Sequence, residues 1–406
     1  MASLLIKNFG PICAGFDEGY FKISRLSVLL GEQGTGKSTV AKIFSVFTWL
    51  EKSFVREYYT DFSLKDFIDL CSYQRLPAEY FEETTELGYQ GGAFSFHIKS
   101  NTFSFEKNAS GSYVCPKIMY VPSERNVVSV LQNVDEIKNF PDILKDFKLE
   151  LKKANLVMTG NIDTFMPDYK VSYDRSEDLN YIQYVGKNVR IPITKASSGL
   201  QSSVPLFLVT NNLLRELQKS ILQRIDDMSI ANKELVLKTL EGTSVYSKLR
   251  LYLDSKIKRN FSQEDIIELD SKISCYVNST FVNIVEEPEQ NLFPMTQIKV
   301  LEELLKNNHI AKGLLFITTH SPYILSALNN YIYADEVYKS KGAMIDEIPE
   351  SLFIDIDEVS AYKIEDGRIF SIKDEECGLI DSSAIDSCSS QINMTYEKLM
   401  NVGERA

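Results

Sequence analysis

Nine consecutive residues near the start of the chain have the composition of a phosphate-binding loop. They read Gly31-Glu32-Gln33-Gly34-Thr35-Gly36-Lys37-Ser38-Thr39 and match the pattern Gly-x-x-x-x-Gly-Lys-Ser/Thr at every fixed position. Glycines let successive backbone N–H groups turn onto phosphate oxygens, the Lys37 ammonium adds a point charge, and the Ser38 hydroxyl suits Mg²⁺. The sequence therefore predicts a site for ATP and Mg²⁺ made by Gly31, Gly34, Thr35, Gly36, Lys37, Ser38 and Thr39.

Two further groups of polar residues follow apolar runs in the second half of the chain. Glu286-Glu287-Pro288 comes directly after the apolar run 281–285, and His320 follows the apolar run 314–317. We expect Glu286 to hold Mg²⁺ through water and Glu287 to polarise the attacking water as a general base, although a simple turn with exposed acids is the alternative. Ligands bind at the carboxyl ends of strands in open α/β sheets, which favours a γ-phosphate-sensing role for His320.

The elements that must position these residues follow from the spacing of apolar side chains. An apolar strand over 26–30 leads into the loop and a helix follows it through about residue 57, while strand, helix and strand alternate between 281 and 317. Residues 58–117 alternate as in a small antiparallel sheet with Gly91-Gly92 as a turn, and helical spacing continues from 205 to about 273. We expect an α/β fold with a mostly parallel core sheet, an antiparallel β subdomain and a helical insertion.

Five segments follow from this interpretation. They are an N-terminal ATPase lobe (1–126), a connecting segment (127–204), a helical insertion (205–275), a C-terminal ATPase lobe (276–335) and an acidic C-terminal subdomain (336–406). The last segment holds thirteen acids and four bases between 341 and 386, which is typical of a solvated face or of an acidic docking surface.

Composition excludes several classes of protein. The 406 residues are 44% hydrophobic and carry a net charge of −12, which argues against intrinsic disorder and against wholesale coating of DNA. Six cysteines without a Cys-x-x-Cys pair and three scattered histidines do not form a zinc site. The N-terminus lacks the pattern of a secretory signal and no apolar run approaches the length of a membrane span, so we expect a cytoplasmic protein.

A fourth motif, Ser198-Gly199-Leu200-Gln201, turns these observations into a resemblance. The order of phosphate loop, Ser-Gly-x-Gln, apolar strand with Glu-Glu-Pro, and strand with Thr-His resembles the ABC-type ATPase heads. Segments 196–202, 286–294 and 318–325 look like those of bacterial ATPases of the overcoming-lysogenisation-defect (OLD) type. The ATPase subunits of the Septu, Gabija and PARIS antiphage systems are similar.

The resemblance implies roles for individual residues. Ser198, Gly199 and Gln201 would contact ATP, the first two across a head-to-head homodimer in which two protomers sandwich two nucleotides. Leu200 stands where transporter heads usually have a second glycine. Asn291 and Phe293 stand where many relatives carry histidines, so we expect no catalytic role for Asn291 or Phe293.

The segment 120–126 also resembles a family segment. Within it, Arg125 is expected either to touch phosphate or to pair with Glu124.

Four functions are considered, and two of them lead. The first is an ATP-driven switch that controls a separate effector, plausibly a nuclease in antiphage defence, since only about 75 residues follow Asn330, too few for the nuclease domain of OLD-type enzymes. Asp355-Ile356-Asp357 is interpreted as surface charge. The alternative is a DNA-transaction ATPase that engages DNA through Lys152, Lys153, Lys256, Lys258 and Arg259. A transporter motor is disfavoured by the long insertion and Leu200, and a nucleotide-binding scaffold with little turnover completes the hypotheses.

Overall fold

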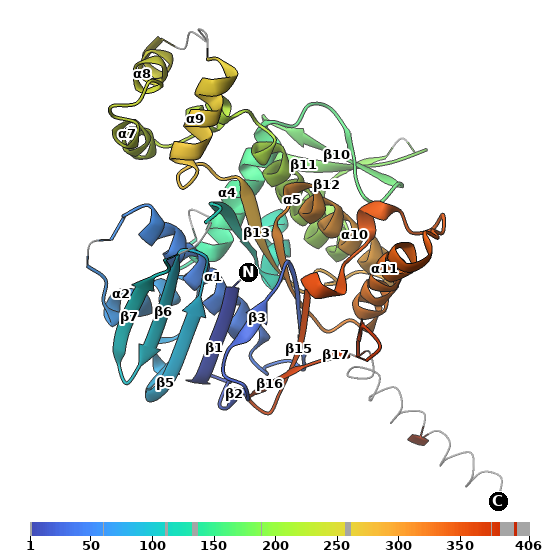
Figure 1. Ribbon diagram of the computed structural model, residues 1–406. Helices are drawn as coiled ribbons and strands as arrows, with labels where there is room; N and C mark the ends of the chain where they lie inside the picture. The colour runs from blue at the N-terminus through green and yellow to red at the C-terminus, as the bar shows by residue number, and fades with distance from the viewer. Residues whose placement is uncertain are drawn as a thin grey trace, which may run out of the picture.

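The computed structural model describes residues 2–59, 61–109, 113–131, 137–187, 189–255, 261–374, 376–381 and 394–395. Its elements form three larger β-sheets, helices packed on both faces of one of them, and a group of helices that stands apart (Figure 1).

A seven-stranded sheet carries every strand that ends in a predicted site motif. Its spatial order is β2 (Gly15–Phe16), β16 (Arg368–Ser371), β15 (Val359–Glu365), β4 (Leu26–Gly31), β14 (Leu314–Thr319), β13 (Thr280–Glu286) and β8 (Pro116–Val121). The five strands β15, β4, β14, β13 and β8 run parallel to one another. Strand β16 is antiparallel to its neighbour β15. The apolar runs are short and unbroken because both faces of this sheet are covered.

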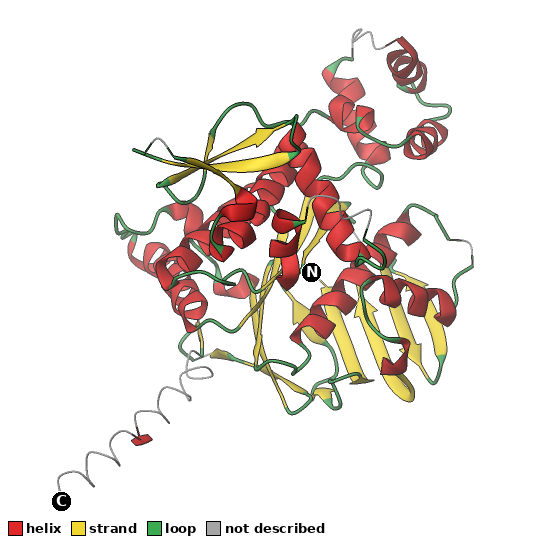
Figure 2. Cartoon of the chain, turned by 180° about the vertical axis from the view of Figure 1, so that it is seen from behind, coloured by secondary structure: helices red, strands yellow, loops and turns green. Residues whose placement is uncertain are grey.

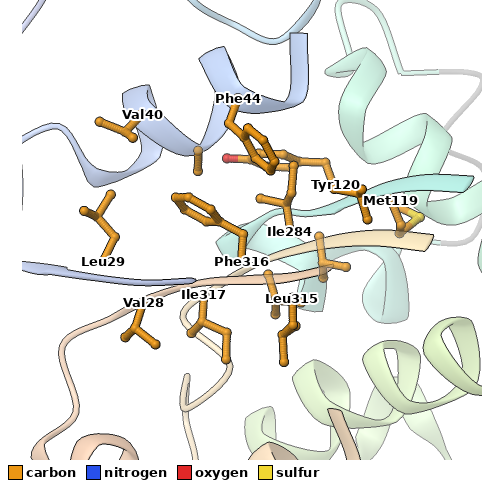
Figure 3. Close-up of a cluster of buried hydrophobic side chains, with 14 of the residues drawn as sticks. Val28, Leu29, Val40, Phe44, Met119, Tyr120, Ile284, Leu315, Phe316 and Ile317 are labelled. Carbon is orange, nitrogen blue, oxygen red and sulfur yellow. The ribbon is translucent and has the colours of Figure 1, made fainter. Parts of the chain in front are cut away.

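Helix α1 (Lys37–Val55) covers one face of the core sheet. Its Phe44 stacks on Phe316 of β14 with ring centroids 5.5 Å apart. Figure 3 shows Val40 and Phe44 of α1 above the strands, whereas Val28 and Ile317 point to the opposite side. There α10 (Pro294–Ala311) contacts β13 and β14, and it packs against α5 (Ser198–Leu217) and α11 (Pro322–Lys341). Helices α3 (Val127–Val130) and α4 (Asp142–Leu156) pack against α5.

The second sheet lies on the outer side of α1 and is antiparallel throughout. Its order is β3 (Phe21–Ile23), β1 (Ala2–Phe9), β5 (Phe81–Gln90), β6 (Phe94–Lys99) and β7 (Thr102–Lys107). Phe47 of α1 stacks on Tyr89 and Phe96, which places the helix between two sheets. The predicted turn is confirmed, because the Gly91 N–H donates to the Phe94 carbonyl at 3.0 Å between β5 and β6. Helix α2 (Leu64–Tyr73) lies before β5.

The remaining elements are smaller. A four-stranded antiparallel sheet contains β12 (Arg190–Pro192), β11 (Leu179–Tyr184), β10 (Tyr169–Asp174) and β9 (Ile162–Asp163). The 3₁₀ helices are η1 (Ala78–Tyr80), η2 (Ser123–Asn126), η4 (Ile193–Lys195), η5 (Glu350–Leu352) and η6 (Ile356–Glu358), and β17 (Lys373–Asp374) pairs with β18 (Leu379–Ile380).

The helical insertion has a hydrophobic core of its own. It comprises α6 (Ile221–Asp226), α7 (Ile230–Thr239), α8 (Tyr246–Ser255) and α9 (Gln263–Ile273). Ile225, Val236 and Leu269 lie in a buried cluster that is separate from the main one. Figures 1 and 2 show α7, α8 and α9 standing away from the sheets. The predicted α/β fold, with its mostly parallel core sheet, antiparallel β subdomain and helical insertion, is confirmed.

The acidic C-terminal segment, which we expected to form a subdomain, contributes a strand to the core sheet. Within it, β15 pairs in parallel with β4, the strand that leads into the phosphate-binding loop, and so belongs to the core sheet. Val359, Ala361 and Ile364 of β15 are buried, and the acids surround rather than interrupt this short apolar pattern. The Asp-x-Asp is surface charge as predicted, since Asp355 binds Lys339 at 2.7 Å and caps η6. The division at residues 126, 204, 275 and 335 stays a prediction.

Among the described residues, no helix combines the length and the apolarity that crossing a bilayer requires.

Candidate nucleotide-binding site

The phosphate-binding loop joins the end of β4 to the first turn of α1. Gly31 and Gly36 adopt φ values of 152° and 109°, in the region that favours glycine. A Cβ atom on Gly31 would lie 2.6 Å from the Ile364 carbonyl oxygen, and one on Gly36 would lie 2.7 Å from the Ile12 side chain. Both positions therefore require glycine on geometric as well as conformational grounds.

The side chains of the loop are arranged around its own carbonyl groups. The Lys37 ammonium donates to the Gly31 and Glu32 carbonyls, each at 2.8 Å, and the Thr35 hydroxyl donates to Glu32 at the same distance. Burial lowers the pKa of Lys37, while Glu287, Glu289 and Glu286 oppose that shift. Ser38 is exposed in the first turn of α1, next to the buried Thr39, and Gly34 turns the exposed tip with a φ of 81°. The three carboxylates therefore offset part of the effect of burial on Lys37, beside the N-terminus of helix α1.

Strand register brings the other predicted residues to the same edge. Thr319 of β14 lies opposite Leu30 of β4, and Glu286 of β13 lies opposite Thr318 of β14. The phosphate-binding loop, Glu286, Glu287 and His320 consequently meet at the carboxyl ends of three adjacent parallel strands, which is where such sheets bind ligands.

Glu286 is almost fully buried and both of its carboxylate oxygens are engaged. One accepts the Tyr120 hydroxyl hydrogen bond at 2.5 Å and the other accepts the Ser123 N–H at 3.1 Å. Mg²⁺ is usually held by one or two protein oxygens together with substrate phosphates and water. Glu286 and the Ser38 hydroxyl fit that pattern, with the occupied oxygens of Glu286 suiting contact through water.

Glu287 and His320 face each other across the site. The His320 Nε2 lies 3.6 Å from the Glu287 Oε1, and this contact holds the pKa of Glu287 below its ordinary value. Glu287 has a φ of 44°, a left-handed conformation that is uncommon for a residue with a side chain. Glu289 holds the end of β14 next to Glu287. Its carboxylate accepts hydrogen bonds from the His320 N–H at 2.7 Å and from the Thr319 hydroxyl at 2.8 Å.

Arg125 is fully buried and ties three segments together. Its guanidinium donates to the backbone carbonyls of Glu286 and Glu287, both at 2.7 Å, and to that of Ser202 in α5 at 3.3 Å. Burial lowers the pKa of Arg125 to about 10. The two sequence-based possibilities for this residue are therefore replaced by a third, because Glu124 pairs with Arg75 at 2.9 Å and Arg125 holds carbonyl groups. Arg125 fixes the peptide of Glu287 relative to the start of α5.

The Ser-Gly-x-Gln segment forms the start of α5. Ser198 is exposed in the first turn, and a Cβ atom on Gly199 would lie 2.8 Å from the Asn291 carbonyl oxygen. The Gln201 amide donates to the Ile193 and Thr194 carbonyls, so in this structure it holds the preceding 3₁₀ turn. Within the described residues, no hydrogen bond or ion pair joins this segment to the phosphate-binding loop of the same chain.

Sequence reasoning missed three residues at this site. Glu289 accepts the His320 N–H, the Tyr120 hydroxyl donates to Glu286, and Glu286 opposes the lowering of the Lys42 pKa by burial. The run Glu-Glu-Pro-Glu was visible, but nothing in it distinguished the third acid from an exposed one. Tyr120 begins the segment 120–126, but nothing in that resemblance gave it a role, and Lys42 belongs to no motif. The pairing of β8 with β13 and the position of α1 bring the two residues to Glu286.

The basic residues proposed for DNA contact are placed only in part. Lys153 pairs with Glu150 at 2.8 Å and Lys152 is exposed on α4, while Lys256, Lys258 and Arg259 lie outside the described residues.

Comparison with known proteins gives distant likenesses. No protein-family model matches the chain, and no curated protein matches it. Among solved structures, the SMC head domain from Thermotoga maritima is 11% identical over 91% of this chain and 97% of that chain, with a TM-score of 0.36. An SmcHead bound to the C-winged helix domain of ScpA is 10% identical over 92% and 98%, with a TM-score of 0.33. The recombination mediator protein RecF with ATP is 11% identical over 91% and 96%, with a TM-score of 0.28. All of these values are low, so the function of the site has to be argued from its own residues.

Proposed function

We propose that this chain is an ABC-type ATPase that binds and hydrolyses ATP with Mg²⁺ between two head-to-head protomers. One observation carries the proposal: Lys37, Glu287 and His320 come from three different strand ends and converge at one edge of a parallel sheet. A chance glycine turn would not bring a general base and a histidine to the same place.

Each side chain then has a chemical task. Lys37 exchanges its contacts with loop carbonyls for the β/γ-phosphate oxygens, and the turned backbone N–H groups complete the cradle. Glu287, kept ionised by His320, accepts a proton from the attacking water, and His320 reads the γ-phosphate. Mg²⁺, when bound near Ser38 and Glu286, supplies charge neutralisation on the phosphates.

The proposed dimer rests on the surface around Ser198. Ser198 is exposed at the N-terminus of a 20-residue helix, which favours binding of phosphate from another protomer. Beyond Gly199, Phe293 at the end of the loop after β13 and Met295 in the first turn of α10 are large apolar side chains that are 75% and 61% exposed. Exposed apolar groups beside a polar binding motif are typical of a protein interface.

The wider role is proposed from the sequence motifs. ATP binding closes the dimer, hydrolysis reopens it, and this two-state element controls a separate effector, a nuclease of antiphage defence. No observation on the described residues favours the alternative of a DNA-transaction ATPase, since Lys153 is already paired with Glu150.

Steady-state ATP hydrolysis with Mg²⁺, measured together with oligomer size, tests the proposal. Wild-type protein is expected to turn over ATP as a dimer or larger species. Glu287→Gln is expected to retain ATP, to lose turnover by roughly 10²- to 10⁴-fold as for a general base, and to accumulate as the closed dimer. Glu234→Gln, which changes an exposed acid on α7, is the matched control and should behave as wild type.

Two results would contradict the proposal. Equal turnover in Glu287→Gln and wild type would remove the general base. Turnover by a strictly monomeric species at every ATP concentration would remove the shared interface.

A further inference from the structure

A large cavity lies beside the core sheet, away from the phosphate-binding loop. It measures about 550 Å³ and is enclosed by α1, α2, β8 and α4; we call it the β8 hollow. Such a volume lies within the range of small-molecule sites in proteins. Strand β8 is the last strand of the core sheet, so its outer edge faces this hollow.

The edge of β8 offers unpaired backbone groups to the hollow. The Cys115 carbonyl points toward β13, where it accepts the Ser279 N–H, and the Pro116 carbonyl points the other way, where it accepts the Lys52 ammonium at 2.6 Å. Alternation along the strand then directs the backbone N–H and C=O groups of Ile118 and Tyr120 outward as well. In the described part of the chain, no side chain hydrogen-bonds to the backbone groups of Ile118 and Tyr120. The edge of β8 therefore presents neighbouring donors and acceptors, which could hydrogen-bond to the edge of a heteroaromatic base.

Two cations of the hollow have no acidic partner among the described residues. Lys52 lies in the last turn of α1 and Arg56 follows four residues later as the residue that ends the helix, a spacing at which like charges repel each other. Lys52 donates to the Pro116 carbonyl and to Asn278, and Arg56 donates to the Cys275 and Tyr276 carbonyls. Burial lowers the pKa of Lys52 to about 7. The two carboxylates that line the hollow are engaged elsewhere, because Glu150 pairs with Lys117 and Lys153 and Asp146 accepts the Tyr73 hydroxyl. An anionic ligand would supply the partner that Lys52 and Arg56 lack.

Aromatic rings line the same hollow. Trp49, Tyr58 and Tyr73 line it, and each of these residues is between 40 and 45% exposed, which is high for such large apolar rings. Such rings bind planar ligands by stacking.

We propose that the β8 hollow binds a nucleoside monophosphate or a ligand of that chemical class, a planar heteroaromatic base that carries an anionic group. The base stacks on the exposed rings and meets the backbone groups of Ile118 and Tyr120, and the phosphate pairs with Lys52 and Arg56. A compact ligand suits the hollow better than a peptide strand, because the hydrogen bond from Tyr73 to Asp146 links α2 to α4 along its wall.

The hollow is linked to the nucleotide site through one residue. Tyr120 lines it, and the hydroxyl of the same side chain binds Glu286. A ligand in the β8 hollow therefore rests on a residue that holds the carboxylate assigned to Mg²⁺.

Intrinsic fluorescence tests the proposal directly, because Trp49 is the only tryptophan in the chain. AMP, GMP, CMP and UMP are titrated into a Lys37→Ala variant, in which the phosphate-binding loop lacks its cation. At least one of the four is expected to change the Trp49 emission saturably, and the matching uncharged nucleoside should bind roughly tenfold more weakly. Lys52→Gln should weaken binding by roughly tenfold, whereas Lys145→Gln, an exposed change on α4, should leave it unchanged.

Tyr58→Leu provides a second variant that does not depend on a buried residue. Loss of one stacking ring should also weaken binding by roughly tenfold. The proposal would be overturned if none of the four nucleotides gave a saturable change at millimolar concentration. It would also be overturned if adding Lys52→Gln or Tyr58→Leu to the Lys37→Ala variant left the affinity unchanged. A signal seen in wild type but lost in Lys37→Ala would assign the nucleotide to the phosphate-binding loop instead. Since no turnover is measured, the result is independent of the proposed ATPase activity.

Discussion

Replacing Arg125 isolates the contribution of a residue that touches neither ATP nor the attacking water in the proposed site. Its guanidinium makes two 2.7 Å hydrogen bonds to the carbonyls of Glu286 and Glu287. A hydrogen bond to a charged group contributes about 1.5–3 kcal/mol, so Arg125→Met should cost about 3–6 kcal/mol of the free energy of unfolding. Arg125→Lys can keep one of the two bonds and should cost about half as much. Because Glu287 sits at a φ of 44°, losing its restraint should also displace the general base.

The assay separates position from binding. Circular dichroism and urea denaturation first establish that Arg125→Lys is folded under the assay conditions, and the variant is then compared with wild type for ATP affinity and for turnover. We expect turnover to fall by roughly 10²-fold, the loss associated with a displacement near 1 Å, with ATP affinity changed by less than about threefold. A loss of ATP affinity as large as that of Lys37→Ala would mean that Arg125 contacts phosphate. Unchanged turnover would refute the positioning role.

Three further outcomes follow from the site. Lys37→Ala should weaken binding of a fluorescent ATP analogue by at least about 10²-fold in polarisation measurements, since it removes a desolvated charge on the phosphates, whereas unchanged polarisation would contradict this. His320 holds the pKa of Glu287 below its ordinary value, so the ionised base persists in acid and is lost only as pH falls through that lowered pKa. In His320→Ala the pKa of Glu287 rises, and the acidic limb of the pH–rate profile should move to higher pH; an unmoved limb would show that Glu287 is not the group observed. Glu289→Ala removes the acceptor of the His320 N–H and Thr319 hydroxyl and should cost about 3 kcal/mol in urea denaturation, which an unchanged urea midpoint would disprove.

Much of the fold was predictable because its signals are local. The phosphate-binding loop, the strand before it and the helix after it occupy consecutive residues. The residue types from Gly31 to Thr39 are enough to predict the conformation of the loop. The turn at Gly91 and the helical spacing of the insertion are equally local. Glu286, Glu287 and His320 could be expected to lie at one edge because parallel strands place their carboxyl ends together, as the register shows.

The rest depends on contacts between distant segments. Arg125 donates to backbone carbonyl groups of other elements. Because every residue has a backbone carbonyl, residue types cannot identify such a partner. Strand β15 was hidden because its flanking acids dominate the composition, although its own buried side chains decide its place. The β8 hollow required knowing that β8 is the last strand of the core sheet and which helices flank it.

The position of β4 has a consequence for synthesis of the chain. Strand β4 spans Leu26–Gly31, yet its two neighbours in the sheet are β14, at Leu314–Thr319, and β15, at Val359–Glu365. On the ribosome, the phosphate-binding loop emerges long before either of the two strands that hold it in place. Until then β4 exposes two unpaired edges and an apolar surface. Nascent chains stalled before Val359 should consequently engage chaperones and remain sensitive to protease at the loop, and nucleotide should protect the chain only after β15 has been translated and released.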